Sequence, residues 1–425
     1  MQGKSDRGTH ADADGRMALP RLPLPSLLRM FWVGSAAAFG LMVLVGYIEY
    51  RMGFPKFHYN PLGGARYEDL MEFPPVYRLL HTAAFFQGVG ESRVAYPPLA
   101  AVLYALIYGT GHAIGFYLGT VAVWLAAVVW GVRRELVARG IGGMTATMFP
   151  LTVALLSFPI AGLLQRGNIE LFLWIFMATG TVAFLRGRED WAAVLWGLAA
   201  ATKLYPVALL VLLLPRRRWR AFGLGVGTFV GATVASLWWL GPTMGVALRG
   251  SLRNVFMYQG VFVSQWNLHE LAANHSAFGL VKLVAMVAGV PLAKLTLPYY
   301  ACAAVVLGWA FFARLWSMPV ANQLLAVTAF MTMLPPISYF YTLVQLYAPL
   351  LVLLFVAIRA DRACVQVPGL KMTVLLFVPL LGSFMLFTFP RVFLFGGLVQ
   401  ACLLGMLFAC AMRFQFAVDG AEAGV

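Results

Sequence analysis

Long apolar runs alternate with short polar segments along most of this chain. Most runs are continuous over about 18–24 residues, the length of a helix that crosses a bilayer, and they lack the strict alternation of barrel strands. Hydrophobic residues make up 61% of the sequence and charged residues only 11%, against about 25% charged in a soluble domain. The pattern therefore predicts an all-α, polytopic transmembrane helical bundle. We expect one transmembrane domain over residues 28–415, between cytoplasmic tails at 1–27 and 416–425.

Basic residues predict how the helices are oriented. Short loops rich in Lys and Arg stay on the cytoplasmic side of a membrane, and such clusters follow several of the apolar runs. Placing every cluster inside puts both termini in the cytoplasm and gives about twelve crossings. The predicted crossings are 28–49, 113–132, 144–163, 169–185, the short pair 191–203 and 205–214, 221–240, 299–315, 320–335, 343–358, 371–388 and 391–413.

Two long polar segments are then left on the outer face, at about 51–96 and 241–298. Loops of this length without structure of their own are usually functional. The apolar stretch 98–111 follows the first segment and is an interfacial or re-entrant helix or a further span. The stretch 277–293 lies within the second segment and is an interfacial helix or a further span.

The run 191–214 is flanked by basic clusters at both ends, so both ends should lie on the same side of the membrane. We therefore expect a break at Lys203-Leu204-Tyr205-Pro206, with one half of the run going up and the other coming back. A lysine held at such depth is costly and usually functional. The alternative is a lysine that only extends its charge to the headgroups.

This topology gathers the unusual polar residues on the outer face. Asp69 is a candidate general base, because nearby apolar residues raise the pKa of a carboxylate while a nearby Arg66 lowers it. A solvated acid that pairs with Arg66 is the alternative, and Glu72 is a rival base. His81 is either a cavity residue or a buried hydrogen-bonding residue. The other candidates for the cavity are Gln165, Asn168, Tyr96, Asn274, His275, Ser276, Ser338 and Tyr341.

Several short motifs follow one another along the chain: Tyr96-Pro97-Pro98, Arg166-Gly167-Asn168, Gly197 with Lys203-Leu204-Tyr205-Pro206, and Asn274-His275-Ser276 with Gly279. Together they resemble glycosyltransferase family 87, of the GT-C superfamily of integral-membrane enzymes. That superfamily includes polyprenyl-phosphate-mannose-dependent mannosyltransferases. The resemblance covers about residues 28–358, and its most specific part is the Lys-Leu-Tyr-Pro stretch followed by Arg-Arg-Trp-Arg.

The resemblance implies an acceptor-activating aspartate in the first outer loop, for which Asp69 is the best match. It also implies that Lys203 faces the donor phosphate and that Arg166 and Asn168 line the cavity. We add Arg249 and Arg253 as further candidates for the phosphate. The chain departs from the family pattern at Gln165-Arg166-Gly167-Asn168, where Gly-Gln-x-Asn is common, and at Ser338-Tyr339-Phe340-Tyr341-Thr342, which lacks the usual histidines.

The sequence thus predicts an inner-membrane hexosyltransferase whose site faces the exterior. The expected donor is a polyprenyl-phosphate-linked sugar, mannose-like, and the expected acceptor is a lipid or glycan. A single base without a second carboxylate nucleophile favours inversion. We expect no cofactor, although a divalent cation at Asp69 stays possible. The net charge of +15 does not indicate a nucleic-acid partner, because its clusters lie between hydrophobic runs, where orientation and contact with membrane lipids explain them.

The main alternative function is a polyprenyl-lipid or solute transporter, or flippase, without bond cleavage. Such a protein needs polar residues near the middle of the bilayer. Runs such as 28–48, 221–240 and 371–388 are nearly free of charge, which favours the enzyme.

Overall fold

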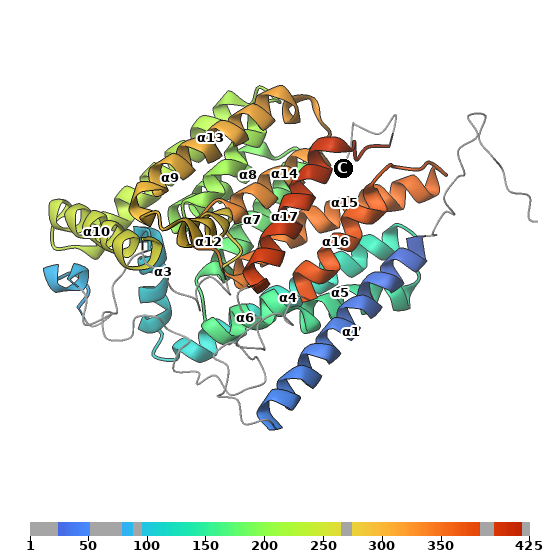
Figure 1. Cartoon of the computed structure of the whole chain (residues 1–425), viewed down its shortest axis with the longest axis horizontal. Coiled ribbons are helices and arrows are strands. Elements are labelled where there is room, and N and C mark those ends of the chain that lie inside the picture. The colour runs from blue at the N-terminus through green and yellow to red at the C-terminus, as the bar shows by residue number, and fades with distance from the viewer. Residues whose placement is uncertain (1–23, 52–78, 88–95, 265–273, 383–394, 419–425) are drawn as a thin grey trace, which may run out of the picture.

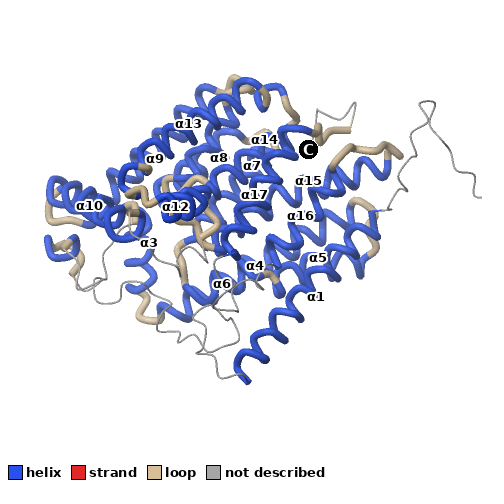
Figure 2. Tube along the Cα trace, viewed as in Figure 1, coloured by secondary structure: helices blue, strands red, loops and turns tan. Residues whose placement is uncertain are grey.

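A computed structural model describes residues 24–51, 79–87, 96–264, 274–382 and 395–418. Within these residues every regular element is helical and there is no strand (Figure 2). The described residues also contain an isolated antiparallel β-bridge between Asn274 and Tyr339. The prediction of an all-α protein is confirmed.

Most helices of the bundle are long and lie roughly alongside one another (Figure 1). In chain order, the helices are α1 (Leu24–Arg51), η2 (Ala83–Phe86), α3 (Pro98–Gly109), α4 (Ala113–Ala138), α5 (Gly143–Leu156), α6 (Phe158–Arg166), α7 (Glu170–Leu185), α8 (Glu189–Thr202), η3 (Tyr205–Leu213), α9 (Trp219–Leu240), α10 (Met244–Tyr258), η4 (Gln259–Val263), α12 (Ala277–Ala288), η5 (Leu292–Lys294), α13 (Thr296–Ala313), η6 (Leu315–Ser317), α14 (Val320–Met333), η7 (Phe340–Leu346), α15 (Tyr347–Arg362), α16 (Leu370–Gly382) and α17 (Phe395–Arg413).

Five helical segments among the described residues are long and apolar enough to cross a membrane, and α5 with α6 forms a sixth if the bent pair counts as one span. The total of about twelve crossings stays a prediction. The five segments are Ala113–Ala138, Trp219–Leu240, Leu292–Ala313, Phe340–Arg362 and Gly396–Arg413.

These segments differ in how much protein surrounds them. In the most apolar window of Phe340–Arg362, 78% of the residues are buried, against 11% for Ala113–Ala138 and 17% for Leu292–Ala313. Large apolar side chains such as Val123 and Val305 are exposed on the outer helices α4 and α13. Helix α15 therefore lies in the core of the bundle, and α4 and α13 lie at the periphery of the bundle. The exposed apolar faces of α4 and α13 are stable only against lipid or another protein.

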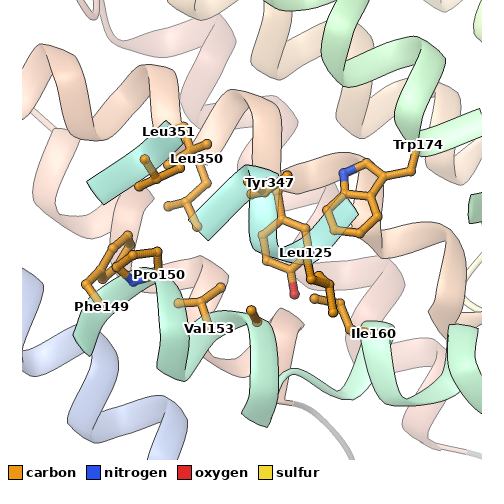
Figure 3. Close-up of a pocket in the computed structure, with 12 residues that line it drawn as sticks. Leu125, Phe149, Pro150, Val153, Ile160, Trp174, Tyr347, Leu350 and Leu351 are labelled. Carbon is orange, nitrogen blue, oxygen red and sulfur yellow. The ribbon is translucent and has the colours of Figure 1, made fainter. Parts of the chain in front are cut away.

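The expected span 144–163 is bent and not straight. Helix α5 contains Pro150 and ends at Leu156, and α6 starts at an angle of 50° to it. Ser157 makes the break, because its backbone is extended and its hydroxyl accepts the Ile160 N–H (3.4 Å). Tyr347 of α15 also donates a hydrogen bond to Ser157. A small apolar cavity of about 40 Å³ lies beside this bend, and Figure 3 shows Tyr347 and Trp174 among its walls.

The basic ends of several helices meet one another. Arg139, after α4, lies over the Phe355 ring of α15 at 4.3 Å, and Arg314, after α13, donates to the Met412 carbonyl of α17 (3.1 Å). Figure 1 shows α6 at the opposite end of α17 from the C-terminus. The bundle therefore has one end rich in arginine and another where α6 and the hinge that follows it lie.

Helix α8 and η3 fold back on each other as the sequence predicts. Arg218, just after η3, pairs with Glu189 at the start of α8 (3.3 Å), and Arg220 pairs with Asp190 (3.1 Å). The two ends of the run 191–214 are thus on the same side, and the break between the halves lies at the far end of α8.

Candidate active site

Lys203 ends α8 at this break. Its backbone is extended (φ −144°, ψ 143°) and η3 starts two residues later with Pro206 in its first turn. Proline disfavours helical geometry in the residue before it and lacks an N–H, so the Lys-Leu-Tyr-Pro sequence stops the α-helix here. The lysine side chain leaves the helix end and is only 14% exposed.

The ammonium group of Lys203 forms a buried ion pair with Glu170. The distance from Lys203 Nζ to Glu170 Oε2 is 2.7 Å, and a second contact reaches Asn168 Oδ1 at 3.3 Å. The rings of Tyr96 and Tyr341 lie 5.5 and 5.3 Å from the same Nζ, within the range of cation–π attraction. A carboxylate, an amide oxygen and two aromatic faces therefore hold this charge in place.

Glu170 is the first residue of α7 and is completely buried. Besides Lys203 it accepts hydrogen bonds from the Tyr205 hydroxyl and from Gln345 Nε2 (2.8 Å). An anion is also favoured at the N-terminus of a helix. With three donors and no solvent contact, Glu170 is suited to stabilising Lys203 and not to taking a proton from a substrate.

The hinge between α6 and α7 holds Asn168 in a defined position. Gly167 adopts a left-handed conformation (φ 56°), which a glycine tolerates without strain. Asn168 Oδ1 accepts the Glu170 N–H (3.0 Å), and its Nδ2 donates to the Tyr96 hydroxyl (3.2 Å). Tyr104 from α3 accepts the Ile169 N–H at 3.0 Å. The backbone that carries Asn168 and Glu170 is thus fixed by side chains from neighbouring helices. We call Tyr96, Asn168, Glu170, Lys203, Tyr205, Tyr341 and Gln345 the Lys203 cluster.

A second polar cluster joins the segment before α12 to the turn before η7. Asn274 Nδ2 donates to the Pro336 carbonyl (3.0 Å), and Asn274 Oδ1 accepts the backbone N–H groups of Ser276 (3.0 Å) and Ser338 (2.9 Å). His275 Nε2 lies 3.0 Å from Ser338 Oγ and 3.2 Å from Thr342 Oγ1. All of these side chains are buried. We call Asn274, His275, Ser276, Ser338 and Thr342 the His275 cluster.

The His275 cluster carries no charge at neutral pH. Burial lowers the pKa of His275 to about 3, against an ordinary value of 6.5, although a side-chain hydrogen bond with Gln400 acts in the opposite direction. The imidazole is therefore neutral and exchanges hydrogen bonds with two hydroxyl groups. This arrangement suits a structural link between two segments.

Helix η7 belongs to both clusters. Its Tyr341 and Gln345 contact Lys203 and Glu170, whereas its Thr342 contacts His275. The tight 3₁₀ winding, with about three residues per turn, places these residues within about one and a half turns of one another. The position of η7 therefore couples the packing of the His275 cluster to the surroundings of Lys203.

The structure brings together most of the predicted cavity residues, but in two groups. Tyr96, Asn168, Lys203 and Tyr341 meet in one cluster. Asn274, His275, Ser276 and Ser338 meet in the other. The sequence predicted a single cavity because both groups border the same outer loops.

Other predicted residues lie elsewhere. Arg249 and Arg253 are exposed on α10, and Arg249 donates to the Gly245 carbonyl of its own helix (3.1 Å). His81 is exposed, with its ring edge against Trp239 at the end of α9 (5.2 Å). Within the described residues, the ion pair, hydrogen bonds and ring contacts of Lys203 do not involve these three residues. Arg166 is the half-buried last residue of α6, two positions before Asn168.

Three predicted residues cannot be placed. Asp69 and Glu72 fall in residues 52–78, which lie outside the described part of the chain, and for Gln165 only the backbone, within α6, is described. Their roles stay predictions. In the described residues no group of three or more His, Cys, Asp or Glu side chains gathers as metal ligands would.

The sequence left three members of the Lys203 cluster out of the predicted site: Glu170, Tyr205 and Gln345. Glu170 could have been found, because a carboxylate at the start of an apolar helix requires a cationic partner, and the sequence places Lys203 at the same face. Gln345 has no such signal, since it lies 175 residues from Glu170 in the chain.

An all-helical bundle with membrane-length apolar segments and a buried, charged cluster at one end defines a membrane protein with an enclosed polar site. Residues 95–336 of this chain match glycosyltransferase family 87, and the chain belongs to this family. It is therefore a membrane glycosyltransferase. The matched range includes Tyr96, Asn168, Glu170, Lys203 and His275. No curated protein matches the chain.

Proposed function

We propose that this protein transfers a hexose, mannose-like, from a polyprenyl-phosphate carrier to a lipid or glycan acceptor on the outer side of the plasma (inner) membrane. The observation that carries the proposal is the Lys203 cluster. It holds an ammonium group, paired with a buried carboxylate, at a helix break near one end of a membrane bundle, in a chain of a glycosyltransferase family.

Lys203 would bind the phosphate of the donor. Glu170 and Asn168 fix the ammonium group before the substrate arrives, so little reorganisation is needed when the phosphate binds. The low dielectric strengthens the attraction of the ammonium group for a phosphate, as it strengthens its pairing with Glu170. Arg166 lies two residues before Asn168 and would contribute a second positive charge to the binding of the phosphate. Arg249 and Arg253 stay candidates from α10.

The base in this proposal is Asp69, with Glu72 as its alternative. The acceptor hydroxyl gives its proton to Asp69 while its oxygen forms a bond to the anomeric carbon. The bond between that carbon and the phosphate oxygen breaks, and polyprenyl phosphate leaves with the electron pair, which Lys203 stabilises. The result is inversion at the anomeric carbon. Glu170 does not compete for the role of base, because its two oxygens are occupied by Lys203, Tyr205 and Gln345.

The test uses the purified full-length protein, a synthetic polyprenyl-phosphate-mannose and an acceptor lipid. Asp69→Asn should lower the transfer rate by about 100- to 10,000-fold, the usual contribution of a general base, while thermal unfolding stays as in the wild type. Glu72→Gln is the matched control and should keep most of the activity. A normal rate in Asp69→Asn with a large loss in Glu72→Gln would exchange their roles.

The same assay distinguishes the alternative function. A membrane glycosyltransferase of the proposed kind releases polyprenyl phosphate only when acceptor is present. Movement of the intact carrier across a vesicle membrane, without release of polyprenyl phosphate, would contradict the proposal and indicate a transporter.

A further inference from the structure

A basic cavity lies where α8 and α9 begin, at the other end of α8 from Lys203. It has a volume of about 760 Å³, and its walls are formed by residues 187–191 and 217–221. The two turns that form it are separated in sequence by the whole of α8 and η3. We call it the arginine cavity.

The arginine cavity carries more positive charge than its own carboxylates neutralise. Glu189 pairs with Arg218 at 3.3 Å, and Asp190 pairs with Arg220 at 3.1 Å. Arg188 and Arg217 also line the cavity, and within the described residues neither has a carboxylate in salt-bridge distance. The acids orient two arginines and leave the other two able to bind an anion.

The backbone around the cavity adds to this positive potential. Arg217 has a left-handed conformation (φ 55°), and the N–H groups of Arg217 and Arg218 donate back to the carbonyls of Leu214 (2.9 Å) and Leu213 (3.1 Å). This turn carries the arginines over the start of α8. Helix α9 then begins with no side-chain cap and no acidic residue in its first turn. Its first N–H groups have no partner within the helix and carry partial positive charge.

Two exposed tryptophans place the arginine cavity at the surface of the bilayer. Trp191 and Trp219 both line it and are 66% and 61% exposed. Trp219 is also the first residue of the candidate membrane span Trp219–Leu240. Tryptophan is enriched at the level of the lipid headgroups. The arginines therefore lie at the depth where lipid phosphates are found.

We propose that the arginine cavity binds the phosphate headgroup of an anionic phospholipid. Arginine forms paired hydrogen bonds with phosphate, and basic pockets between membrane helices bind anionic headgroups. Arg188 and Arg217 contact the phosphate, and Trp191 and Trp219 pack beside the upper part of the acyl chains. This binding site is separate from the Lys203 cluster and does not depend on the proposed function.

Native mass spectrometry of the full-length protein in detergent tests this assignment. Phosphatidylglycerol is titrated against the wild type and against the double variant Arg188→Gln/Arg217→Gln, with phosphatidylcholine as the neutral lipid. The matched control is Arg133→Gln/Arg134→Gln, which removes the same charge from exposed positions near the end of α4. Thermal unfolding of each variant confirms that it is folded.

We expect phosphatidylglycerol binding to weaken about 30-fold in the Arg188/Arg217 variant and by less than about threefold in the control. Phosphatidylcholine should bind weakly to all three proteins. Equal losses in both double variants would show a general charge effect and overturn the proposal. It would also be overturned if inorganic phosphate displaced phosphatidylglycerol at equal concentration, because the cavity would then take free phosphate. If Arg188→Gln/Arg217→Gln does not fold, the two single variants are compared with Arg133→Gln in the same way.

Discussion

The Lys203 cluster and the His275 cluster are both buried and both rest on η7, yet they differ in charge. The first encloses an ion pair in which the lysine keeps 14% of its side-chain surface exposed. The second consists of neutral amide, hydroxyl and imidazole groups, and its histidine is completely buried. A buried charge is costly to keep and persists where it has a task, whereas a neutral network with its hydrogen bonds made stabilises a fold. We therefore expect changes in the Lys203 cluster to act on catalysis and stability, and changes in the His275 cluster to act mainly on stability.

The largest effect should come from separating the buried ion pair. Glu170→Ala leaves the Lys203 charge without its carboxylate and should destabilise the protein by about 3–5 kcal/mol. Stability is measured as thermal or denaturant unfolding in detergent. The double variant Glu170→Ala/Lys203→Met should recover part of the lost stability, but it should have no transfer activity because Lys203 is gone.

The matched control for the ion pair is Glu135→Ala. Glu135 pairs with Arg139 at 3.4 Å, but its side chain is 43% exposed, so its removal should cost at most about 1 kcal/mol. Equal losses in Glu170→Ala and Glu135→Ala would show that burial of the Lys203 pair has no special energetic role.

The next effect concerns the neutral cluster. His275→Ala removes the hydrogen-bond partner of Ser338 and Thr342 and leaves a cavity, which together should cost about 2–4 kcal/mol of unfolding free energy. The exposed His112→Ala serves as a control and should change stability by less than about 0.5 kcal/mol. If the purified variant that remains folded keeps its KM for the donor, a structural role is supported. A large rise in KM without loss of stability would instead indicate direct contact with substrate.

Stability should also fall in acid because of His275. Its pKa is about 3 in the folded protein and about 6.5 in the unfolded chain, so below pH 6.5 the unfolded chain binds a proton that the folded protein does not. This contribution to stability is complete above pH 6.5 and is lost as the pH falls toward 3. The loss of stability is about 2 kcal/mol at pH 5.

The measurement compares unfolding of the wild type and of His275→Gln between pH 7.5 and pH 5, where other titrating groups are common to both proteins. The wild type should lose about 2 kcal/mol more than the variant over this range. Parallel pH profiles would mean that the imidazole takes up its proton at the same pH in the folded protein as in the unfolded chain, and that burial does not keep the cluster neutral in acid.

The smallest effect separates two contributions of Tyr96. Tyr96→Phe removes the hydroxyl that accepts from Asn168 but keeps a ring near Lys203, and should cost about 1 kcal/mol of unfolding free energy. Tyr96→Leu removes the ring as well and should cost about 0.5–2 kcal/mol more. Identical losses in the two variants would show that the aromatic face does not stabilise the lysine.

Much of the architecture could be predicted from local sequence. The apolar runs predicted the helices, and the basic residues on both sides of the run 191–214 predicted that it folds back at Lys203, which the pairs Arg218–Glu189 and Arg220–Asp190 confirm. These predictions succeeded because they rest on forces that act at short range along the chain: hydrophobic length, proline geometry and charge beside a membrane. The bend at Ser157 was not predicted, although the cap that Ser157 gives to α6 and the proline in the first turn of α6 are local signals. Only the additional hydrogen bond from Tyr347, 190 residues away in the chain, has no local signal.

The sequence alone determined that this is an all-helical membrane protein, that Lys203 lies at a helix break, and that the chain resembles glycosyltransferase family 87. Only the tertiary structure decided which partner the lysine has, and that the outer-face polar residues divide into a charged cluster and a neutral one. The physical reason is that an ion pair or a hydrogen bond forms between groups within about 3 Å, whereas Glu170, Lys203 and Gln345 come from three distant parts of the chain. Their meeting depends on how whole helices pack, and no local pattern of residues records it.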